Sequence, residues 1–553
     1  MVYEVMLTLF PGQEEDQALV KKRILRILSD GGTHISSSEV SAIVCKKKSV
    51  DARRKDVKYH IRYAVYVGET PSNNFTPVWQ NADESKQVVV VGAGPAGLFA
   101  ALALLEKGIQ PIVIERGCET SQRKKDIANI NKSGSVNENS NYCFGEGGAG
   151  TFSDGKLYSR SNKRGDISRI LSILHYHGAD KEILSDAHPH VGTDKLPKII
   201  NEITATIRKF GGQVLFNTKC IDFELDESHH ITAVKTLNIE NNEEKTIPVK
   251  YVILATGHSA DDIYNLVATC AVDHAHVTSD NRMYVLQKAL EAKTYAIGVR
   301  VEHPRELIDS IQYGEDSVEK NLGSAEYRLS TQIAGRGVYS FCMCPGGYVV
   351  PSASSPDHIV VNGMSASGRD SFWSNSAFVV ETRPEDIPSE FGSDVLAGLK
   401  FRANIEEEAF RQIQATNSKN PQSAPAQRLI DFLEGRLSED LPKTSFLPGL
   451  ISSRLDLWIP DHISLRLKDA FREFDTKMKG FICKEAILIA PETRTSTPIR
   501  ILRDTTTCES PVLKGLFPTG EGSGYSGGIV SSAMDGENVA NAIIENILNK
   551  SIS

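Results

Sequence analysis

Cysteine is scarce in this sequence, and so is any excess of positive charge. Nine cysteines are spread over 553 residues, and no two of them have CxxC spacing. These features exclude a disulfide framework and favour a reducing, cytoplasmic environment. The formal net charge is −8, so the chain as a whole lacks the positive field expected of a general nucleic-acid binder.

Targeting and membrane signals are also lacking. The apolar run at the start has no basic region before it and ends at Phe10, which argues against a signal peptide. The uncharged run 88–105 reaches the lower end of transmembrane length, but a cluster of glycines and a proline interrupts it. With 40% hydrophobic and 24% charged residues, the composition is typical of a globular protein of several domains.

The first part of the chain predicts a small α+β unit. Residues 2–9 and 58–67 have the pattern of strands, and residues 15–29 have that of an amphipathic helix. We expect a ferredoxin-like N-terminal domain with its linker over residues 1–84, because a polar stretch containing two prolines follows Glu69.

The remainder predicts an α/β domain divided by an insertion. Strand, helix and strand follow one another from residue 88, which places the first part of this domain at 85–275. Short strands mixed with helices predict an inserted, β-rich α+β domain over 276–480. An apolar strand after Lys484 and a final helix predict that residues 481–553 complete the first domain.

A dinucleotide-binding motif lies between the strand 88–91 and a helix. Gly92 permits the tight turn, Gly94 lets the backbone approach a pyrophosphate, and Gly97 lets the helix pack closely on the strand. The helix N-terminus would face the phosphates, and Glu115 would accept hydrogen bonds from the ribose. The predicted cofactor-binding residues of this unit are Gly92, Gly94, Pro95, Ala96, Gly97, Glu115 and Arg116.

Three similar glycine patterns are weaker. Residues 145–150 have the same spacing without a preceding strand, and the chain ends too soon after residues 522–527 for the rest of a βαβ unit. Residues 150–156 have the spacing of a P-loop, but Leu157 stands where Mg²⁺ binding needs a hydroxyl. An NTPase is therefore excluded.

Two later segments, 251–257 and 515–522, resemble flavin contacts. In FAD proteins similar to glutathione reductase, an Ala-Thr-Gly strand follows inserted β-strands, and a late strand ends in Gly-Asp or Gly-Glu. This resemblance implies that Glu521 contacts the ribitol and that the helix starting near Tyr525 directs its positive end at the flavin. The cofactor-binding residues it implies are Thr256, Gly257, Gly520, Glu521, Ser526, Gly527, Gly528 and Ile529.

Longer motifs resemble the bacterial family of uncharacterised FAD-dependent dehydrogenases, also called NAD(FAD)-utilising dehydrogenases. They include GEGGAGTFSDGKLYSR (145–160), FCMCPGGYVV (341–350), PETRTSTPIRILRD (491–504) and GYSGGIVSSAMDG (524–536). The resemblance implies a bipartite, Rossmann-like FAD-binding domain with an inserted substrate domain, and it assigns no substrate. In the glycine-dense loop 145–155 we expect Gly147 and Gly148 to contact FAD, with a merely tight surface loop as the alternative.

Four residues are candidates for catalysis, each with a structural alternative. Cys342 and Cys344 would share one face of a strand, either as packing residues, as redox thiols facing the flavin or as metal ligands, and a disulfide between them would be strained. Arg300 lies with Glu302 and His303 in a run that returns to the flavin or forms an exposed strand edge. Arg494 would neutralise an anionic substrate or reduced flavin, or form a structural ion pair.

Two further features are expected to be mainly structural. His188 and His190 have no partner cluster that would support a metal site, so no metal is expected. The basic stretch 46–62 is typical of a solvated face, and RNA or a protein partner is its alternative.

Together these features predict an FAD-dependent oxidoreductase, a flavoprotein that transfers hydride through flavin N5 to or from an unidentified small molecule. Because there is one complete nucleotide-binding motif, we expect NAD(P)H to dock at most transiently. The alternatives are a flavoprotein that acts on RNA through its basic N-terminal domain, and a noncatalytic FAD-binding protein that docks a partner.

Overall fold

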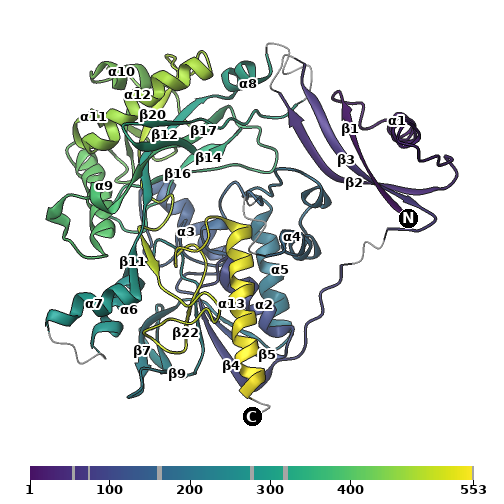
Figure 1. Ribbon diagram of the computed structural model, residues 1–553. Helices are drawn as coiled ribbons and strands as arrows, with labels where there is room; N and C mark the ends of the chain where they lie inside the picture. Colours follow the sequence, from purple (N-terminus) through teal and green to yellow (C-terminus); the bar gives the residue numbers. More distant parts are fainter. Residues whose placement is uncertain (53–55, 72–74, 159–164, 274–278, 315–321, 551–553) are drawn as a thin grey trace.

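The computed structural model describes residues 1–52, 56–71, 75–158, 165–273, 279–314 and 322–550. An N-terminal unit lies beside a larger body that contains two main sheets (Figure 1). Among the described residues, no helix combines the length and the apolar character needed to cross a bilayer.

The N-terminal unit is a three-stranded antiparallel sheet with one helix, in the strand order β1-β3-β2. Asp16 caps the helix, since its carboxylate accepts the Leu19 N–H at 2.9 Å, and Ile24 is fully buried against the sheet. The expected ferredoxin-like unit differs from this arrangement, because the described residues supply one helix and no fourth strand. The elements are β1 (Val2–Leu9), α1 (Gln17–Asp30), β2 (Val40–Asp51) and β3 (Lys58–Val67).

A five-stranded parallel sheet carries the glycine motif, in the order β22-β10-β4-β5-β6. Val88 and Val90 face one core and Val89 faces the other, so the strand is buried on both sides, as its unbroken apolar run predicts. The strands of this sheet are β4 (Asp83–Val91), β5 (Ile109–Ile114), β6 (Gln213–Leu215), β10 (Val252–Leu254) and β22 (Leu516–Pro518). The helices that share a core with Val88 and Val90 are α2 (Pro95–Leu105), α4 (Ile167–Tyr176), α5 (Leu196–Lys209) and α13 (Ile529–Lys550).

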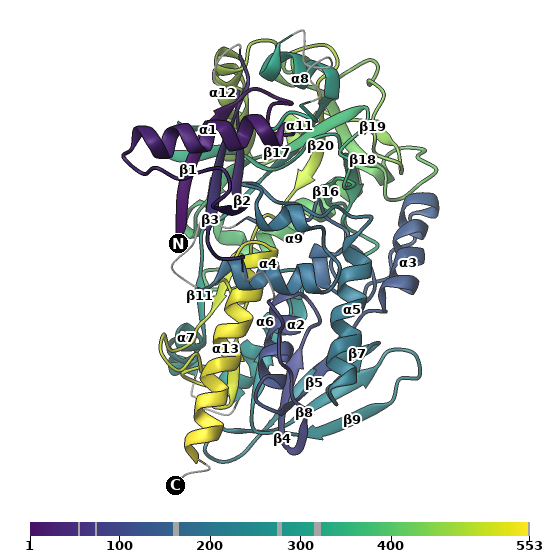
Figure 2. The same cartoon turned by 90° about the vertical axis from the view of Figure 1, so that its right-hand side faces the viewer.

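Helix α13 lies along α2, so the C-terminal part of the chain returns to the layer in which the glycine motif begins (Figures 1 and 2). The mixed α/β fold with a parallel sheet is therefore confirmed. The remaining elements of this half of the molecule are α3 (Thr120–Ser133), β7 (Thr218–Leu225), β8 (Ile231–Asn238), β9 (Glu244–Pro248), α6 (Asp261–Asp273), α7 (Ser279–Ala289), β11 (Leu290–Ala292) and β21 (Ile499–Ile501).

The second main sheet has seven strands in the order β13-β14-β17-β12-β20-β18-β19. Phe378 on this sheet packs against Phe471, Phe474 and Phe481 in a core that excludes solvent. The strands are β12 (Tyr295–Pro304), β13 (Ser330–Ile333), β14 (Arg336–Cys344), β17 (Trp373–Thr382), β18 (Ala424–Arg428), β19 (Leu450–Ser452) and β20 (Ile487–Glu492), and a small hairpin of β15 (Tyr348–Pro351) and β16 (Val361–Met364) accompanies them. The helices are α8 (Arg305–Tyr313), α9 (Ala397–Gln414), α10 (Leu429–Glu434), α11 (Leu455–Trp458) and α12 (Asp461–Lys477).

Strand β20 corrects one expectation. The apolar strand after Lys484 was expected in the FAD part of the chain, but β20 pairs with β12 and β18 in the seven-stranded sheet. Both sheets bury such a strand on two faces, so its apolar pattern does not distinguish them. Further along the chain, β22 joins the five-stranded sheet and α13 packs against α2 on it.

Candidate functional site

One large cavity, with a volume of about 1770 Å³, lies where the two main sheets approach each other. Its walls come from the glycine turn after β4, the loop 148–156, the segment after β10, the segment 519–535 and parts of the seven-stranded sheet. Lys47 and Ser49 of β2 also line it. The volume exceeds the range of about 300–1,000 Å³ usual for small-ligand pockets, so the cavity has room for a dinucleotide and a second molecule.

The glycine turn is shaped for the close approach of another molecule's atoms. Gly92 has φ of +108°, and a Cβ there would lie 2.4 Å from the Ala255 carbonyl oxygen. A Cβ on Gly97 would lie 1.9 Å from the Gly92 oxygen, so this glycine serves the packing of α2 on the turn. A Cβ on Gly94 would meet only the Gly148 Cα, at 3.8 Å, and Gly94 lines the cavity. Gly94 thus presents bare backbone to the space.

The loop after Gly145 packs directly on this turn. The Gly147 N–H donates to the Ala93 oxygen at 2.8 Å, and a Cβ on Gly147 would strike Thr151. Gly148 lines the cavity, whereas Gly147 faces away from it. The loop therefore forms part of the cavity wall and is not an isolated surface turn.

Glu115 is buried beneath the turn and organises it. One carboxylate oxygen accepts the Ala93 N–H at 2.9 Å, and the other accepts the N–H groups of Gly117 and Gly145 at 2.9 and 3.0 Å. Glu115 also lines the cavity, and a carboxylate has about four acceptor positions, so one position remains for a ribose hydroxyl. Its neighbour Arg116 forms an ion pair with Asp262, in which Nη2 donates to both carboxylate oxygens at 2.8 Å.

The ends of β10 and β22 bring a carboxylate and an imidazole together at the cavity. Glu521 lies 3.7 Å from His258 Nδ1. Burial raises the pKa of Glu521 to about 7, while burial together with Arg402 and Arg494 lowers that of His258 to about 3. Near neutral pH the His258 imidazole is therefore neutral, and the Glu521 carboxyl group is close to the pH at which it gains or loses its proton.

The N-terminus of α13 also faces the cavity. Gly527 and Gly528 line the cavity, and a Cβ on either would have no atom within 4 Å. The positive end of the helix and open backbone therefore meet the same space. Of the predicted cofactor-binding residues, Gly97 and Gly147 do not line the cavity, and all the others do.

Two of the four catalytic candidates line the cavity, and the other two do not. Cys342 and Arg494 line the cavity, whereas Cys344 and Arg300 are fully buried behind it. Arg300 donates to Glu492 through Nε at 2.9 Å and to Asn375 through Nη1 at 2.7 Å. Its strand is therefore interior, and neither an exposed edge nor a flavin contact describes Arg300.

Arg494 is committed to a carboxylate inside the protein. Its Nη2 and Nε donate to the two oxygens of Glu406 at 2.8 and 3.1 Å, and its Nη1 donates to Ser354 at 2.7 Å. Burial alone raises the pKa of Glu406, but Arg494 and Arg402 outweigh it and bring the pKa to about 2. The structure thus favours the ion-pair alternative for Arg494.

An ion network in the cavity wall was not predicted from the sequence. Asp154 lies 3.2 Å from Lys156 and 2.7 Å from Arg369, which also pairs with Glu326 at 2.6 Å. The GxxxxGK spacing includes Asp154 and Lys156, but their partner Arg369 lies more than 200 positions away and nothing in the sequence connects it.

The histidine pair and the basic stretch both reach the large cavity, which His188, His190 and Lys47 line. His190 Nε2 lies 3.2 Å from the Ser367 oxygen, and within the described ranges no group of His, Cys, Asp and Glu is arranged to hold a metal. In the basic stretch, Lys48 pairs with Glu14 at 2.9 Å and Lys47 lines the cavity. Arg53, Arg54 and Lys55 lie outside the described residues.

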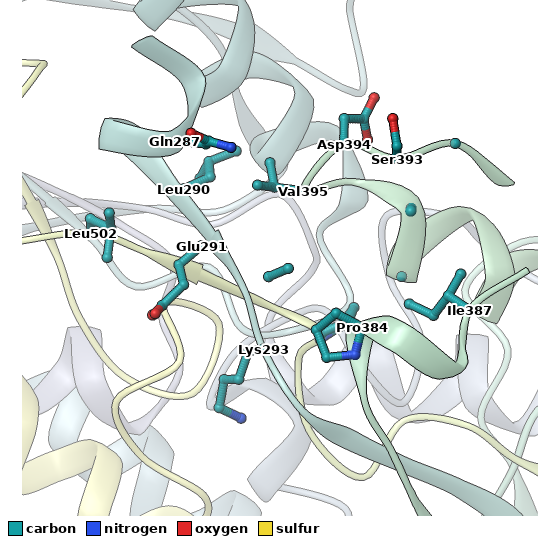
Figure 3. A pocket seen from close by; sticks show the side chains of 15 residues that line it. Gln287, Leu290, Glu291, Lys293, Pro384, Ile387, Ser393, Asp394, Val395 and Leu502 are labelled. Carbon is teal, nitrogen blue, oxygen red and sulfur yellow. The ribbon is translucent and has the colours of Figure 1, made fainter. Parts of the chain in front are cut away.

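A second, smaller cavity of about 430 Å³ lies between β11 and the segment 384–398. Figure 3 shows Glu291 and Lys293 along one side of it and Asp394 on the other. Glu291 pairs with Arg500 at 2.7 Å, and burial lowers the pKa of Lys293, whose charge also acts on Glu521. Lys293 therefore connects this cavity electrostatically with the large one.

Three family models match the chain. Residues 85–262 match an FAD binding domain, residues 294–495 match the C-terminal domain-like region of FAD-dependent proteins, and residues 1–66 match a domain of unknown function. An uncharacterized protein of Clostridium beijerinckii is 38% identical over 553 aligned positions, and the alignment covers 96% of this chain and 97% of that protein.

Two other similarities are more limited. A dual trans-enoyl reductase/FAD-dependent monooxygenase of Aspergillus terreus is 51% identical over 41 residues, 7% of this chain and 6% of that protein. A flavocytochrome c3 fumarate reductase in an open conformation is 13% identical, with a TM-score of 0.33 over 83% of this chain and 78% of that one. None of these similarities supports a contact with RNA.

Proposed function

The chain belongs to the same family as the uncharacterized protein of Clostridium beijerinckii and contains an FAD-binding domain, and on this premise we propose that it is an FAD-dependent oxidoreductase. FAD is its cofactor. When bound, FAD supplies hydride exchange with a small-molecule substrate through N5. The finer assignment as a dehydrogenase is part of this proposal.

The large cavity carries the proposal. Segments around Gly94, Gly257 and Gly527 are far apart in the sequence, yet all three expose open backbone to one space. Among the described residues, no side chain fills the position above any of them, so the residues present fit a dinucleotide that needs close backbone approach. The rest of the cavity extends to the seven-stranded sheet and would hold the substrate.

In this proposal each part of the chain has a defined task. Residues 85–275 and the segment after β20 hold the cofactor, and the seven-stranded sheet supplies the substrate side of the cavity. The N-termini of α2 and α13 would stabilise negative charge on the pyrophosphate and on the flavin ring. Glu115 would accept a ribose hydroxyl, and Glu521 would contact the ribitol.

The residues around Glu521 also hold a proton near the site. Burial raises the pKa of the Glu521 carboxyl to about 7, so this group holds a proton more readily near neutral pH than an exposed carboxyl does. Neutral His258 adds no charge, and the pKa effect of its hydrogen bond with the Arg494 backbone shows that the ring donates there. Glu521 and His258 therefore place less negative charge beside the cofactor than a permanently ionised carboxylate would.

Anaerobic reduction tests the proposal. Purified protein loaded with FAD should lose its yellow colour on addition of NADH, NADPH or one member of a metabolite panel, and regain it with an electron acceptor. A protein that keeps FAD but reacts with no donor and no acceptor would instead favour the noncatalytic docking role. Salt-sensitive RNA binding that disappears on removal of residues 1–84 would favour the RNA alternative.

A further inference from the structure

The end of β14 is an irregular point in the cavity wall. Cys342 has φ of +45°, a left-handed conformation that is uncommon for residues other than glycine. The register of β14 on β17 shifts here, because Phe341 pairs with Ala377 whereas Cys344 pairs with Asn375. One extra residue therefore lies in β14, which makes this a β-bulge.

The bulge changes the relation of the two cysteines. In a regular strand, residues two apart have Cα atoms about 6.8 Å apart, at the upper limit for a disulfide. At the bulge, the Cys344 thiol donates a hydrogen bond to the Cys342 carbonyl oxygen at 3.3 Å. The Cys344 thiol also interacts with the Cys342 thiol. Cys342 faces the cavity, and Cys344 is fully buried behind it.

Two cations hold the same segment. Arg300 Nη1 donates to the Cys342 oxygen at 3.3 Å, and Lys156 Nζ donates to the Met343 oxygen. The hydrogen bond from the Cys344 thiol, with the charges of Lys156 and Arg300, brings the pKa of Cys342 well below its usual range. A cysteine that serves packing alone requires neither a left-handed backbone nor nearby cations.

We propose that Cys342 and Cys344 form a redox-active dithiol that exchanges two electrons with FAD in the cavity. This inference rests on the proposed function. In the oxidising direction both S–H bonds break, one S–S bond forms, and FAD takes up the two electrons and two protons to become FADH₂. Reduction of the disulfide by FADH₂ is the reverse. Cys342 is the thiol that faces the cofactor, and Cys344 closes the disulfide.

Thiol counting on protein freed of FAD tests the dithiol by itself. After oxidation with diamide, unfolding and alkylation, the wild type should label at two fewer than its nine cysteines, with the loss mapped to the peptide holding both residues. Cys342→Ser and Cys344→Ser should show no paired loss. Cys483→Ser, a partly buried position outside the cavity wall, should lose two thiols as the wild type does.

Reductive titration of the FAD-loaded protein tests the electron exchange. Oxidised wild type should take up about four electrons per FAD, whereas Cys342→Ser and Cys344→Ser should each take up about two. Nine free thiols after oxidation, or about two electrons per FAD in the wild type, would overturn the proposal. Protein that binds no FAD would refute the proposed function, and the thiol count would still judge the cysteine pair.

Discussion

At the scale of single residues, the two glycines at the start of α2 have opposite tasks. A side chain at Gly94 would point into the cavity, whereas one at Gly97 would collide with the Gly92 carbonyl inside the protein. We therefore predict that Gly94→Val folds but loses at least nine-tenths of its FAD, because the valine occupies the space needed for the pyrophosphate.

A second variant, at Gly97, distinguishes an effect on FAD binding from an effect on folding. Gly97→Ala should lower the unfolding temperature by several degrees, since its Cβ would lie 1.9 Å from a backbone oxygen. Flavin absorbance and thermal unfolding, measured on both variants, check this pair of outcomes. Full flavin content in Gly94→Val would refute the placement of the pyrophosphate.

The buried ion pair of Glu406 and Arg494 predicts a pH-dependent stability. The folded-state pKa of Glu406, about 2, is below its ordinary value of 4.5, so its contribution is present above pH 4.5 and is lost as the pH falls toward 2. Glu406→Gln should lower the free energy of unfolding by about 3–5 kcal/mol at pH 7, and by much less at pH 3.

Glu407, the next residue on α9, provides the matched control. Its side chain is 48% exposed, so Glu407→Gln should change the free energy of unfolding by less than about 0.5 kcal/mol. Denaturant titrations at pH 7 and pH 3 measure both variants. Equal effects of the two substitutions would show that the Arg494 pair is not the stabilising contact.

From residue types and spacing, contacts within one turn were easier to predict than contacts between segments that lie far apart in the sequence. The positive φ of Gly92 and the contact of Gly97 with the Gly92 oxygen follow from local backbone geometry, which the motif encodes. The partners of Arg300 and Arg494 lie 192 and 88 positions away, so the sequence left an ion pair as one alternative for Arg494 and identified no partner for either arginine.

At the scale of elements, the β-bulge in β14 is another feature that the sequence pattern did not predict. Alternation along a strand places Cys342 and Cys344 on one face, but the inserted residue breaks that alternation. No glycine marks the bulge, because Cys342 itself adopts the positive φ. Strand β20 was also misplaced because apolar strands of either sheet have the same pattern, whereas the strands and helices around the glycine motif were predicted closely.

Helix α13 allows an element-scale prediction. A carboxylate at Gly527 would lie at the helix N-terminus and point into open space. Gly527→Asp should stabilise the FAD-free protein by about 0.5 kcal/mol through the helix dipole, yet weaken FAD binding roughly tenfold because the negative charge meets the cofactor. Gly527→Asn, which has the same shape without the charge, should keep more of the affinity. Fluorescence titration with FAD measures both, and equal affinities would exclude the electrostatic role of α13.

At the scale of the whole molecule, FAD binding should connect segments that are distant in sequence. FAD at about 100 times its dissociation constant should add about 2.7 kcal/mol to the free energy of unfolding. Hydrogen exchange should slow together around residues 92–97, 148–156, 256–258 and 519–529, because all four segments line one cavity. Protection confined to residues 92–97 would mean that the C-terminal segment does not contribute to the site.

The flavin content of the purified wild type tests the central claim most directly. After release by denaturation, the absorbance of the cofactor should correspond to about one FAD for each chain, and the stripped protein should regain the same amount from solution. A colourless protein that takes up no FAD under these conditions would contradict the assignment of the cavity.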